Sequence, residues 1–167
     1  TIFNILGPLT NPAEAPHQLL GVYSRDWLRP VAEVLRGLGS RHVLGVHAED
    51  GIGEISIEAP THVAELVNGE IREYTISPEQ FGIERAPLDL VRAADAAESL
   101  AMIRRVYAGE PGPAADLVVL NAGAAIYAAD LAESLDAGLA RARQLLESGA
   151  AARKLDEFVA FTREIAA

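Results

Sequence analysis

The sequence predicts an α/β fold in which a central, mainly parallel sheet is flanked by helices and carries an appended β-hairpin. Three observations support this fold class. Two short apolar runs flank a helical pattern early in the chain, an Asn-Gly pair separates two β-prone runs in the middle, and the last third has helical periodicity. A strand, a helix and a strand within about thirty residues are typical of a right-handed parallel crossover.

The predicted crossover unit covers the first quarter of the chain. Residues 18–23 form a short apolar run, which predicts a buried strand. Leucines and valines spaced for one apolar face predict a helix over about 24–38, and Gly39 ends it. Residues 42–47 predict the second strand. We therefore expect two parallel neighbouring strands, with helices on both faces of the sheet.

The middle of the chain has the pattern of antiparallel strands. Residues 54–57 alternate between polar and apolar side chains, as a strand does. Asn68-Gly69 lies between the β-prone runs 63–67 and 70–76, and this dipeptide suits a type I′ hairpin turn. We expect this hairpin to extend the parallel sheet.

The last third is predicted to be helical. The expected helices cover 94–107, 116–129, 131–148 and 150–165. Gly and Pro at 109–113 separate the first two, and Asp116 is the expected cap of the second. The small residues at 121–125 predict a close approach to another helix or to the sheet.

Composition limits the classes of protein that fit. With 167 residues, half of them hydrophobic, the chain is large enough for one domain with a sizeable core. Its 14 basic and 24 acidic residues give a net charge of −10, which disfavours a nucleic-acid binder. It has no cysteine and no apolar run long enough for a membrane span, so we expect a cytoplasmic, soluble protein. Because it starts with Thr1 inside an apolar segment, we expect a fragment whose missing part lies upstream.

The opening segment is the first candidate site. Residues 4–12 combine two Asn, one Gly and two Pro, which makes a rigid loop. One interpretation is a tight connection into the strand at residue 18. The other is a rigid pocket wall that a ligand approaches closely.

The second candidate is the acidic segment after the second predicted strand. Glu49, Asp50 and Glu54 surround two glycines, at the edge where open α/β sheets bind ligands. Such carboxylates could hold Mg²⁺, which often shares its oxygen ligands with substrate phosphates. The alternative interpretation is an acidic, solvated turn.

The histidines provide no comparable pattern. His17, His42, His47 and His62 lack helical metal-ligand spacing, and no catalytic triad can be argued from sequence alone. His47 is of interest because it ends the second predicted strand beside the acidic segment. An ordinary strand-end role is the favoured interpretation.

Several segments together resemble the C-terminal half of the anthranilate phosphoribosyltransferase family, which has a nucleoside-phosphorylase-like fold. The resemblance runs along the whole chain and is carried by residues 1–12, 18–23, 27–30, 50–56 and 121–125. The segment from Thr1 to Pro12 is the most specific. The resemblance implies that residues 1–167 are the C-terminal part of the family's large α/β domain.

The resemblance also implies a reaction and its participants. The family transfers the phosphoribosyl group of 5-phosphoribosyl 1-diphosphate (PRPP) to the amino nitrogen of anthranilate in tryptophan biosynthesis, using Mg²⁺. By resemblance, Gly7, Pro8 and Asn11 bind substrate and Glu54 is a magnesium ligand. No catalytic residue is assigned. A homodimer is implied for the longer protein, with no nucleic-acid or membrane partner.

Two departures from the family pattern stand out. Gly53 occupies the position of a family aspartate, so either Asp50 or Glu49 takes its place or a second Mg²⁺ binds more weakly. The family's small helical domain and glycine-rich diphosphate loop lie upstream and are absent from this chain. We therefore expect these 167 residues alone to be inactive, and an upstream fragment of the same protein to be a partner.

Other functions remain open at this stage. One alternative is a pyrimidine nucleoside phosphorylase or a related transferase with other ligands. A second is a nucleic-acid-binding paralogue of the same fold, which the net charge of −10 disfavours. A third is a purely structural homologue, for which Gly53 is the only support.

Overall fold

A four-stranded mixed sheet forms the centre of the molecule. The computed structural model describes residue 7 and residues 9–165. The strands are β1 (His17–Gly21), β2 (His42–Ala48), β3 (Thr61–Val67) and β4 (Glu70–Ile76), and they lie in this order across the sheet. β1 and β2 are parallel, whereas β2 with β3 and β3 with β4 are antiparallel.

The sheet therefore corrects part of the prediction. The α/β class, the crossover and the hairpin are confirmed, but only one strand pair of the described residues is parallel. The segment 49–60 between β2 and β3 holds no helix. Without a crossover of that kind, the chain returns on the same side and β3 runs antiparallel to β2.

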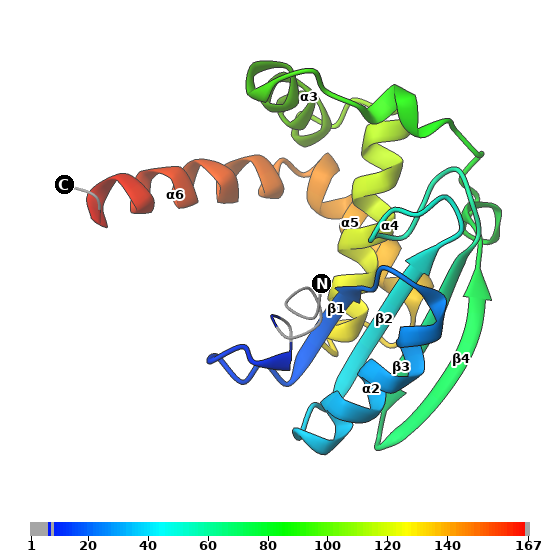
Figure 1. The fold of residues 1–167 in the computed structure, drawn as a ribbon. Helices are drawn as coiled ribbons and strands as arrows, with labels where there is room; N and C mark the ends of the chain where they lie inside the picture. Colours follow the sequence, from blue (N-terminus) through cyan, green and yellow to red (C-terminus); the bar gives the residue numbers. More distant parts are fainter. Residues whose placement is uncertain (1–6, 8, 166–167) are drawn as a thin grey trace.

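The helical elements surround this sheet (Figure 1). They are η1 (Arg25–Trp27), α2 (Leu28–Gly37), η2 (Pro78–Phe81), η3 (Leu88–Val91), α3 (Ala96–Tyr107), α4 (Pro113–Ala128), α5 (Leu135–Glu147) and α6 (Ala150–Ile165). No helix within the described ranges is long and apolar enough to cross a membrane.

Helices cover both faces of the sheet, as predicted. On one face, Val43 and Leu66 pack with Val31 and Leu35 of α2. The neighbouring strand residues point the other way and join the larger core with α4 and α5; they include Leu44, Val46 and Val63. This alternation follows from the two-residue period of a strand.

The predicted hairpin turn has the expected backbone. Asn68 has a φ of 53° and Gly69 a φ of 80°, so both central residues are in the left-handed region that a type I′ turn requires. Val67 pairs with Glu70 across the turn. The strand-like pattern at 54–57 is different, because these residues form no strand and belong to an irregular loop. Ile55 and Ile57 are apolar because the loop is buried there.

The helix that follows the Gly-Pro break begins earlier than predicted. α4 starts at Pro113 rather than at a cap formed by Asp116. Proline suits the first helical position because its φ is already helical and its missing N–H has no partner there. Asp116 lies inside the first turn, where burial raises the pKa of its carboxyl group.

The predicted close approach of small residues is confirmed between α4 and α5. A Cβ at Gly123 would lie 2.5 Å from a side-chain atom of Leu139, and a Cβ at Gly138 would lie 2.3 Å from the Gly123 carbonyl oxygen. Only glycine at both positions allows this distance between the helix axes.

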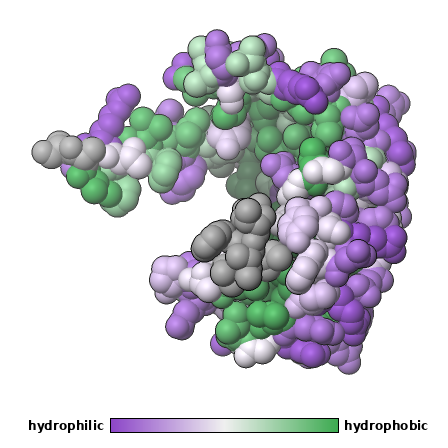
Figure 2. Space-filling model, viewed as in Figure 1, coloured by the Kyte–Doolittle hydropathy of each residue, from purple (hydrophilic) through white to green (hydrophobic). Residues whose placement is uncertain are grey.

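The last helix extends from the rest of the fold. In Figure 1, α6 projects to the left of the sheet and of α5. Its exposed side chains include Phe158, Phe161 and Ile165, and the space-filling view shows apolar residues along this helix (Figure 2). α6 therefore presents apolar surface that the described chain does not cover.

Candidate functional site

The candidate site lies on the segment that follows the carboxyl end of β2. We call residues 49–54 the acidic loop. Two of its three carboxylates already have partners. The Glu49 carboxylate lies 3.1 Å from Nε2 of His62. The Asp50 carboxylate accepts hydrogen bonds from the Ser56 hydroxyl and, at 3.1 Å, from the Ile52 amide. These two carboxylates therefore hold the loop together.

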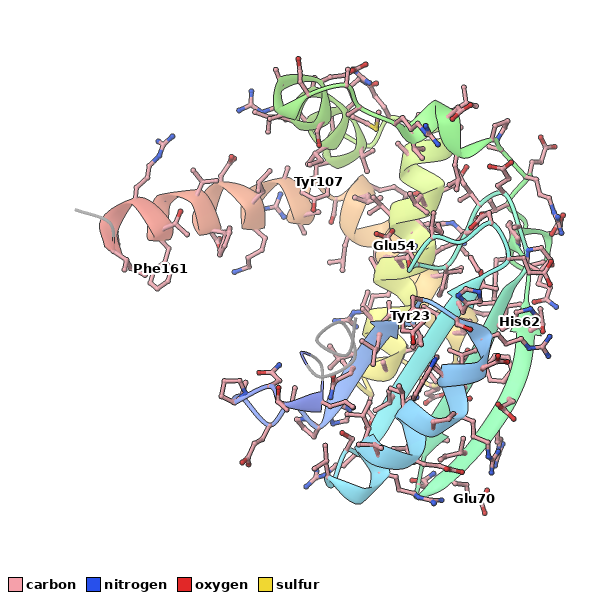
Figure 3. All side chains as sticks on the ribbon, in the orientation of Figure 1. Tyr23, Glu54, His62, Glu70, Tyr107 and Phe161 are labelled. Carbon is pink, nitrogen blue, oxygen red and sulfur yellow. The ribbon has the colours of Figure 1, made fainter. Side chains whose placement is uncertain are left out.

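Glu54 differs from its two acidic neighbours. Its side chain is exposed, and it makes no hydrogen bond or ion pair with any other residue in the described part of the chain. Figure 3 shows Glu54 beside α4. The carboxylate of Glu54 is thus available to a ligand.

The backbone on either side of Glu54 is held in place. The Gly53 carbonyl packs against Gly21 at the end of β1, where a Cβ would lie 1.9 Å from the carbonyl oxygen. On the other side, the Ile55 amide donates to Asn121 of α4 at 2.9 Å. A Cβ at Gly53 itself would meet only the Gly21 Cα, at 3.9 Å, so this position has space for a side chain.

The acidic loop keeps one carboxylate without a partner among the described residues, and this group can contribute to a cation site. Residues 7 and 9–165 contain no group of three or more His, Cys, Asp or Glu side chains arranged to hold a metal. Mg²⁺, however, is commonly bound by one or two carboxylates together with substrate phosphates. Glu54 meets that requirement, whereas the carboxylates of Glu49 and Asp50 are engaged.

Only part of the opening segment belongs to the described residues, namely residue 7 and residues 9–12. Gly7 is exposed, with no atom within 4 Å of the position that a Cβ would occupy, and Pro8 lies outside the described residues. Asn11 is exposed, and its Oδ1 accepts from the Ala13 amide at 3.0 Å. It lines a groove with Leu38 and Ser40, near the amino ends of β1 and β2.

The described residues therefore do not bring all the predicted site residues together. Asn11 lies toward the amino end of β1, whereas Gly53 packs against the carboxyl end of that strand. The turn that Asn11 makes agrees with a connection into β1. The substrate-binding roles of Gly7, Pro8 and Asn11 stay predictions.

The histidines have structural partners. Nδ1 of His47 donates to the Val22 carbonyl at 2.9 Å, which holds the segment after β1 against β2. Nδ1 of His62 lies 3.0 Å from the Thr75 hydroxyl. Nδ1 of His17 donates to the Ala128 carbonyl at 2.8 Å.

A buried polar network around His42 was not predicted from the sequence. Nδ1 of His42 lies 2.7 Å from Asp130, and Nε2 lies 3.3 Å from Glu65. His42 is 2% and Glu65 is 7% exposed. Both ring nitrogens of His42 therefore face a carboxylate. Nothing in the strand patterns around His42 and Glu65 indicated that these residues contact the end of α4.

Two tyrosines complete this network. The Tyr127 hydroxyl donates to Glu65 at 2.7 Å, and burial together with this bond raises the pKa of Tyr127 to about 12. Burial and the charge of Glu65 also raise the pKa of Tyr74. The hydrogen bond from His42 lowers the pKa of Asp130. We call His42, Glu65, Tyr74, Tyr127 and Asp130 the buried network; Asp130, whose side chain is 60% exposed, is its outer end.

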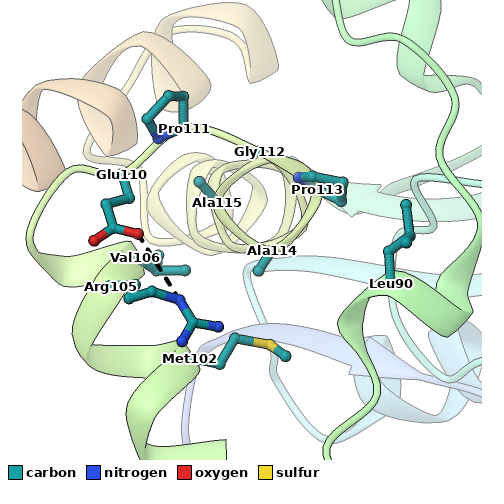
Figure 4. Close-up of a pocket in the computed structure, with 10 residues that line it drawn as sticks. All are labelled: Leu90, Met102, Arg105, Val106, Glu110, Pro111, Gly112, Pro113, Ala114 and Ala115. Atoms are coloured by element: carbon teal, nitrogen blue, oxygen red, sulfur yellow. Dashed lines mark ion pairs between the residues drawn. The ribbon is translucent and has the colours of Figure 1, made fainter.

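A separate pocket lies at the start of α4 (Figure 4). It is lined by the end of α3, by Leu90 and by residues 110–115. Nε of Arg105 lies 3.8 Å from the Glu110 carboxylate at its rim. The pocket has no acidic-loop residue in its lining.

Known proteins resemble this chain along its whole length. Anthranilate phosphoribosyltransferase of Alkalilimnicola ehrlichii is 61% identical over 165 residues, which are 99% of this chain and 49% of that protein. The crystal structure of anthranilate phosphoribosyltransferase from Thermus thermophilus is 45% identical, with a TM-score of 0.88, and is matched over 98% of this chain and 48% of that one.

A more distant structure shares the fold. Anthranilate phosphoribosyltransferase from Saccharomyces cerevisiae in complex with PRPP and Mg is 24% identical, with a TM-score of 0.81, over 95% of this chain and 46% of that one. The chain thus spans about half the length of the relatives it matches. The profile described as "Glycosyl transferase family, a/b domain" matches residues 1–152, and the chain belongs to this family.

Proposed function

We propose that this chain is the C-terminal half of an anthranilate phosphoribosyltransferase. The observation that carries the proposal is the 61% identity to the A. ehrlichii enzyme, which extends over 99% of the chain. In this reaction, the anthranilate nitrogen forms a bond to C1 of PRPP, the bond from C1 to the diphosphate oxygen breaks, and the nitrogen loses a proton. The products are phosphoribosyl anthranilate and diphosphate.

Glu54 is the magnesium ligand in this proposal. Its exposed carboxylate lacks a partner among the described residues, and Mg²⁺ is often shared between a protein carboxylate and substrate phosphates. When bound, Mg²⁺ offsets the negative charge that develops on the departing diphosphate. The yeast enzyme named above, which has the same fold, is a complex with PRPP and Mg.

Positioning is the main task of the remaining site residues. Anthranilate is a weakly basic aromatic amine, so its placement opposite C1 matters more than activation of its nitrogen. We assign the walls of the anthranilate site to Gly7 and Pro8, because proline and glycine make a rigid backbone that a ligand approaches closely. Asn11, which lies toward the other end of β1 from Gly53, is assigned an outer part of the substrate-binding region.

The complete site requires polypeptide beyond this chain. We propose that the other half of the protein supplies the diphosphate-binding loop and a helical domain. The exposed apolar side chains of α6 and the edge position of β1 in the described sheet support a further covering segment. For the longer protein we propose a homodimer and a cytoplasmic location.

An activity assay on the longer protein tests this function. Anthranilate is fluorescent, and we expect its fluorescence to fall only when PRPP and Mg²⁺ are both present. The 167-residue chain alone is expected to show no turnover. Nucleoside phosphorolysis by the longer protein, without loss of anthranilate, would contradict the proposal and favour a pyrimidine nucleoside phosphorylase.

The glycine at position 53 leads to a second test. Glu49 and Asp50 have partners, so neither is free to replace the missing carboxylate, and we expect weak binding of one Mg²⁺. Position 53 has space for a side chain. Gly53→Asp should therefore lower the half-saturating Mg²⁺ concentration of the longer protein roughly tenfold, because an added carboxylate raises affinity. An unchanged Mg²⁺ titration would show that this side chain does not matter.

A further inference from the structure

The loop that carries Glu54 lacks regular structure and must be held by side chains. Residues 49–60 contain no strand or helix. Even so, Ile55, Ser56 and Ile57 are 2%, 0% and 0% exposed, directly after the exposed Glu54. Backbone amides buried in this way need hydrogen-bond partners, and no neighbouring strand supplies them here.

Asn121 supplies the partner for Ile55. Its Oδ1 accepts from the Ile55 amide at 2.9 Å, and its Nδ2 donates to the Ile55 carbonyl, also at 2.9 Å. The side-chain amide thus pairs with the Ile55 backbone much as a neighbouring strand residue would. Both polar groups of Ile55 are satisfied by this one side chain.

A third hydrogen bond fixes the orientation of the Asn121 amide. Nδ2 of Asn121 also donates to the Leu117 carbonyl at 3.0 Å, one turn earlier in α4. A reversed amide would place its donor group against the Ile55 N–H and its oxygen against two carbonyls. The side chain is therefore held by its own helix in the orientation that binds the loop.

The opposite side of Glu54 is held by backbone packing. Gly53 lies against Gly21 at the end of β1, as described above. Glu54 therefore lies between a neighbour fixed on β1 and a neighbour fixed on α4. These two attachments fix the backbone of Glu54 relative to the sheet and so limit where its carboxylate can lie.

We infer that Asn121 is a positioning residue that sets the place of the Glu54 carboxylate for the magnesium–diphosphate group of PRPP. This inference rests on the proposed function. It assigns to α4 a role in the site through the backbone of Ile55, without contact between Asn121 and substrate or metal. Removal of the attachment lets residues 54–56 move, so the ligand has to order them when it binds.

Kinetics of the longer protein test the inference with three variants. Asn121→Ala removes all three hydrogen bonds, and we expect the half-saturating concentrations of Mg²⁺ and PRPP to rise about 10–100-fold, because residues that orient metal ligands have effects of this size. Asn121→Asp keeps the acceptor for the Ile55 amide but cannot donate to the Ile55 carbonyl, and should give an intermediate rise. The KM for anthranilate should stay close to that of the parent protein in both variants.

Tyr127→Phe is the matched control, because it removes one hydrogen bond from the same helix, and that bond goes to Glu65 rather than to the acidic loop. It should leave the Mg²⁺ and PRPP dependence unchanged. Hydrogen exchange of the Ile55 amide provides a readout that needs no activity, and it should become faster in Asn121→Ala but not in Tyr127→Phe.

The outcomes separate this inference from the proposed function. If the parent protein does not consume anthranilate, the proposed function fails, whatever the hydrogen-exchange result. If the parent is active but Asn121→Ala leaves the Mg²⁺ and PRPP dependence unchanged, the positioning role is wrong. An equal rise in the half-saturating concentrations of Mg²⁺, PRPP and anthranilate would also contradict it, because that result indicates general damage to the fold. A fall in kcat alone would contradict it as well, because the inference concerns binding of Mg²⁺ and PRPP.

Discussion

The two ends of the β1–β2 pair use ionisable residues in opposite ways. At the amino ends, His42 bridges Glu65 and Asp130, and Tyr127 donates to Glu65. Beyond the carboxyl ends, Glu54 is exposed and has no partner within the described structure. The residues of the first set pair with one another, whereas the second set offers a carboxylate to a ligand.

This contrast separates a structural cluster of charges from the cluster that we propose as functional. A buried charge is tolerated only when it is paired and hydrogen-bonded, so a saturated network stabilises one arrangement of the chain and has little left to offer a substrate. An exposed carboxylate on a firmly held loop contributes little to stability. The predictions below test whether the two ends differ in this way.

The largest effect is expected in the buried network. Glu65→Ala leaves His42 without one of its two carboxylates and removes the acceptor of Tyr127, and should lower the free energy of unfolding by about 3–5 kcal/mol. Chemical denaturation measures the loss. Glu73→Ala is the control, because Glu73 is exposed and lies 3.6 Å from Arg29 in a surface ion pair. A control with an equal loss would contradict the special role of the network.

The acidic loop should show the reverse behaviour. Glu54→Gln is expected to lower kcat/KM of the longer protein about 100-fold, because it removes the charge that we propose as the metal ligand. The free energy of unfolding should change by no more than about 0.5 kcal/mol, since Glu54 has no partner to lose in the described structure.

Glu84→Gln provides the comparison for this prediction. Glu84 is exposed and lies outside the acidic loop, so its variant should match the parent in both activity and stability. A loss of stability in Glu54→Gln as large as its loss of activity would remove the distinction between the two ends.

A smaller effect tests how the acidic loop meets the sheet. Gly21→Ala would place a Cβ 1.9 Å from the Gly53 carbonyl oxygen, so the loop has to move away. We expect a loss of about 1–3 kcal/mol in the free energy of unfolding. The half-saturating Mg²⁺ concentration of the longer protein should also rise, because the loop that carries Glu54 is displaced. Gly37→Ala, at the end of α2, is the control because no atom lies within 4 Å of its Cβ position. Equal free energies of unfolding for Gly21→Ala and Gly37→Ala would contradict the proposed contact between the acidic loop and β1.

The smallest effect concerns alkaline pH. Tyr127 keeps its proton in the folded protein up to a pKa of about 12, whereas in the unfolded chain it titrates near its ordinary value of 10.0. The folded state thus binds more protons between these values, and its stability should fall as pH rises from 10 to about 12. In Tyr127→Phe the melting temperature should fall less steeply over this range. Equal slopes for variant and parent would contradict the prediction.

Local patterns in the sequence determined the early crossover and the hairpin. The apolar runs at 18–23 and 42–47, the helix between them and the Asn68-Gly69 turn depend on residues close in the chain, and all were found. The resemblance to a known family was likewise present in contiguous segments such as Thr1–Pro12, and the comparisons agree with it.

Contacts between distant residues decided the rest. Ile55 and Ile57 alternate like a strand, but their partners are Asn121 and the core rather than a neighbouring strand. The structural role of His42 depends on its contacts with Glu65 and Asp130, which lie 23 and 88 residues away in the chain. Periodicity reports which face of an element is apolar, whereas the pairing of polar groups depends on which elements meet in space, and only the tertiary structure fixes that.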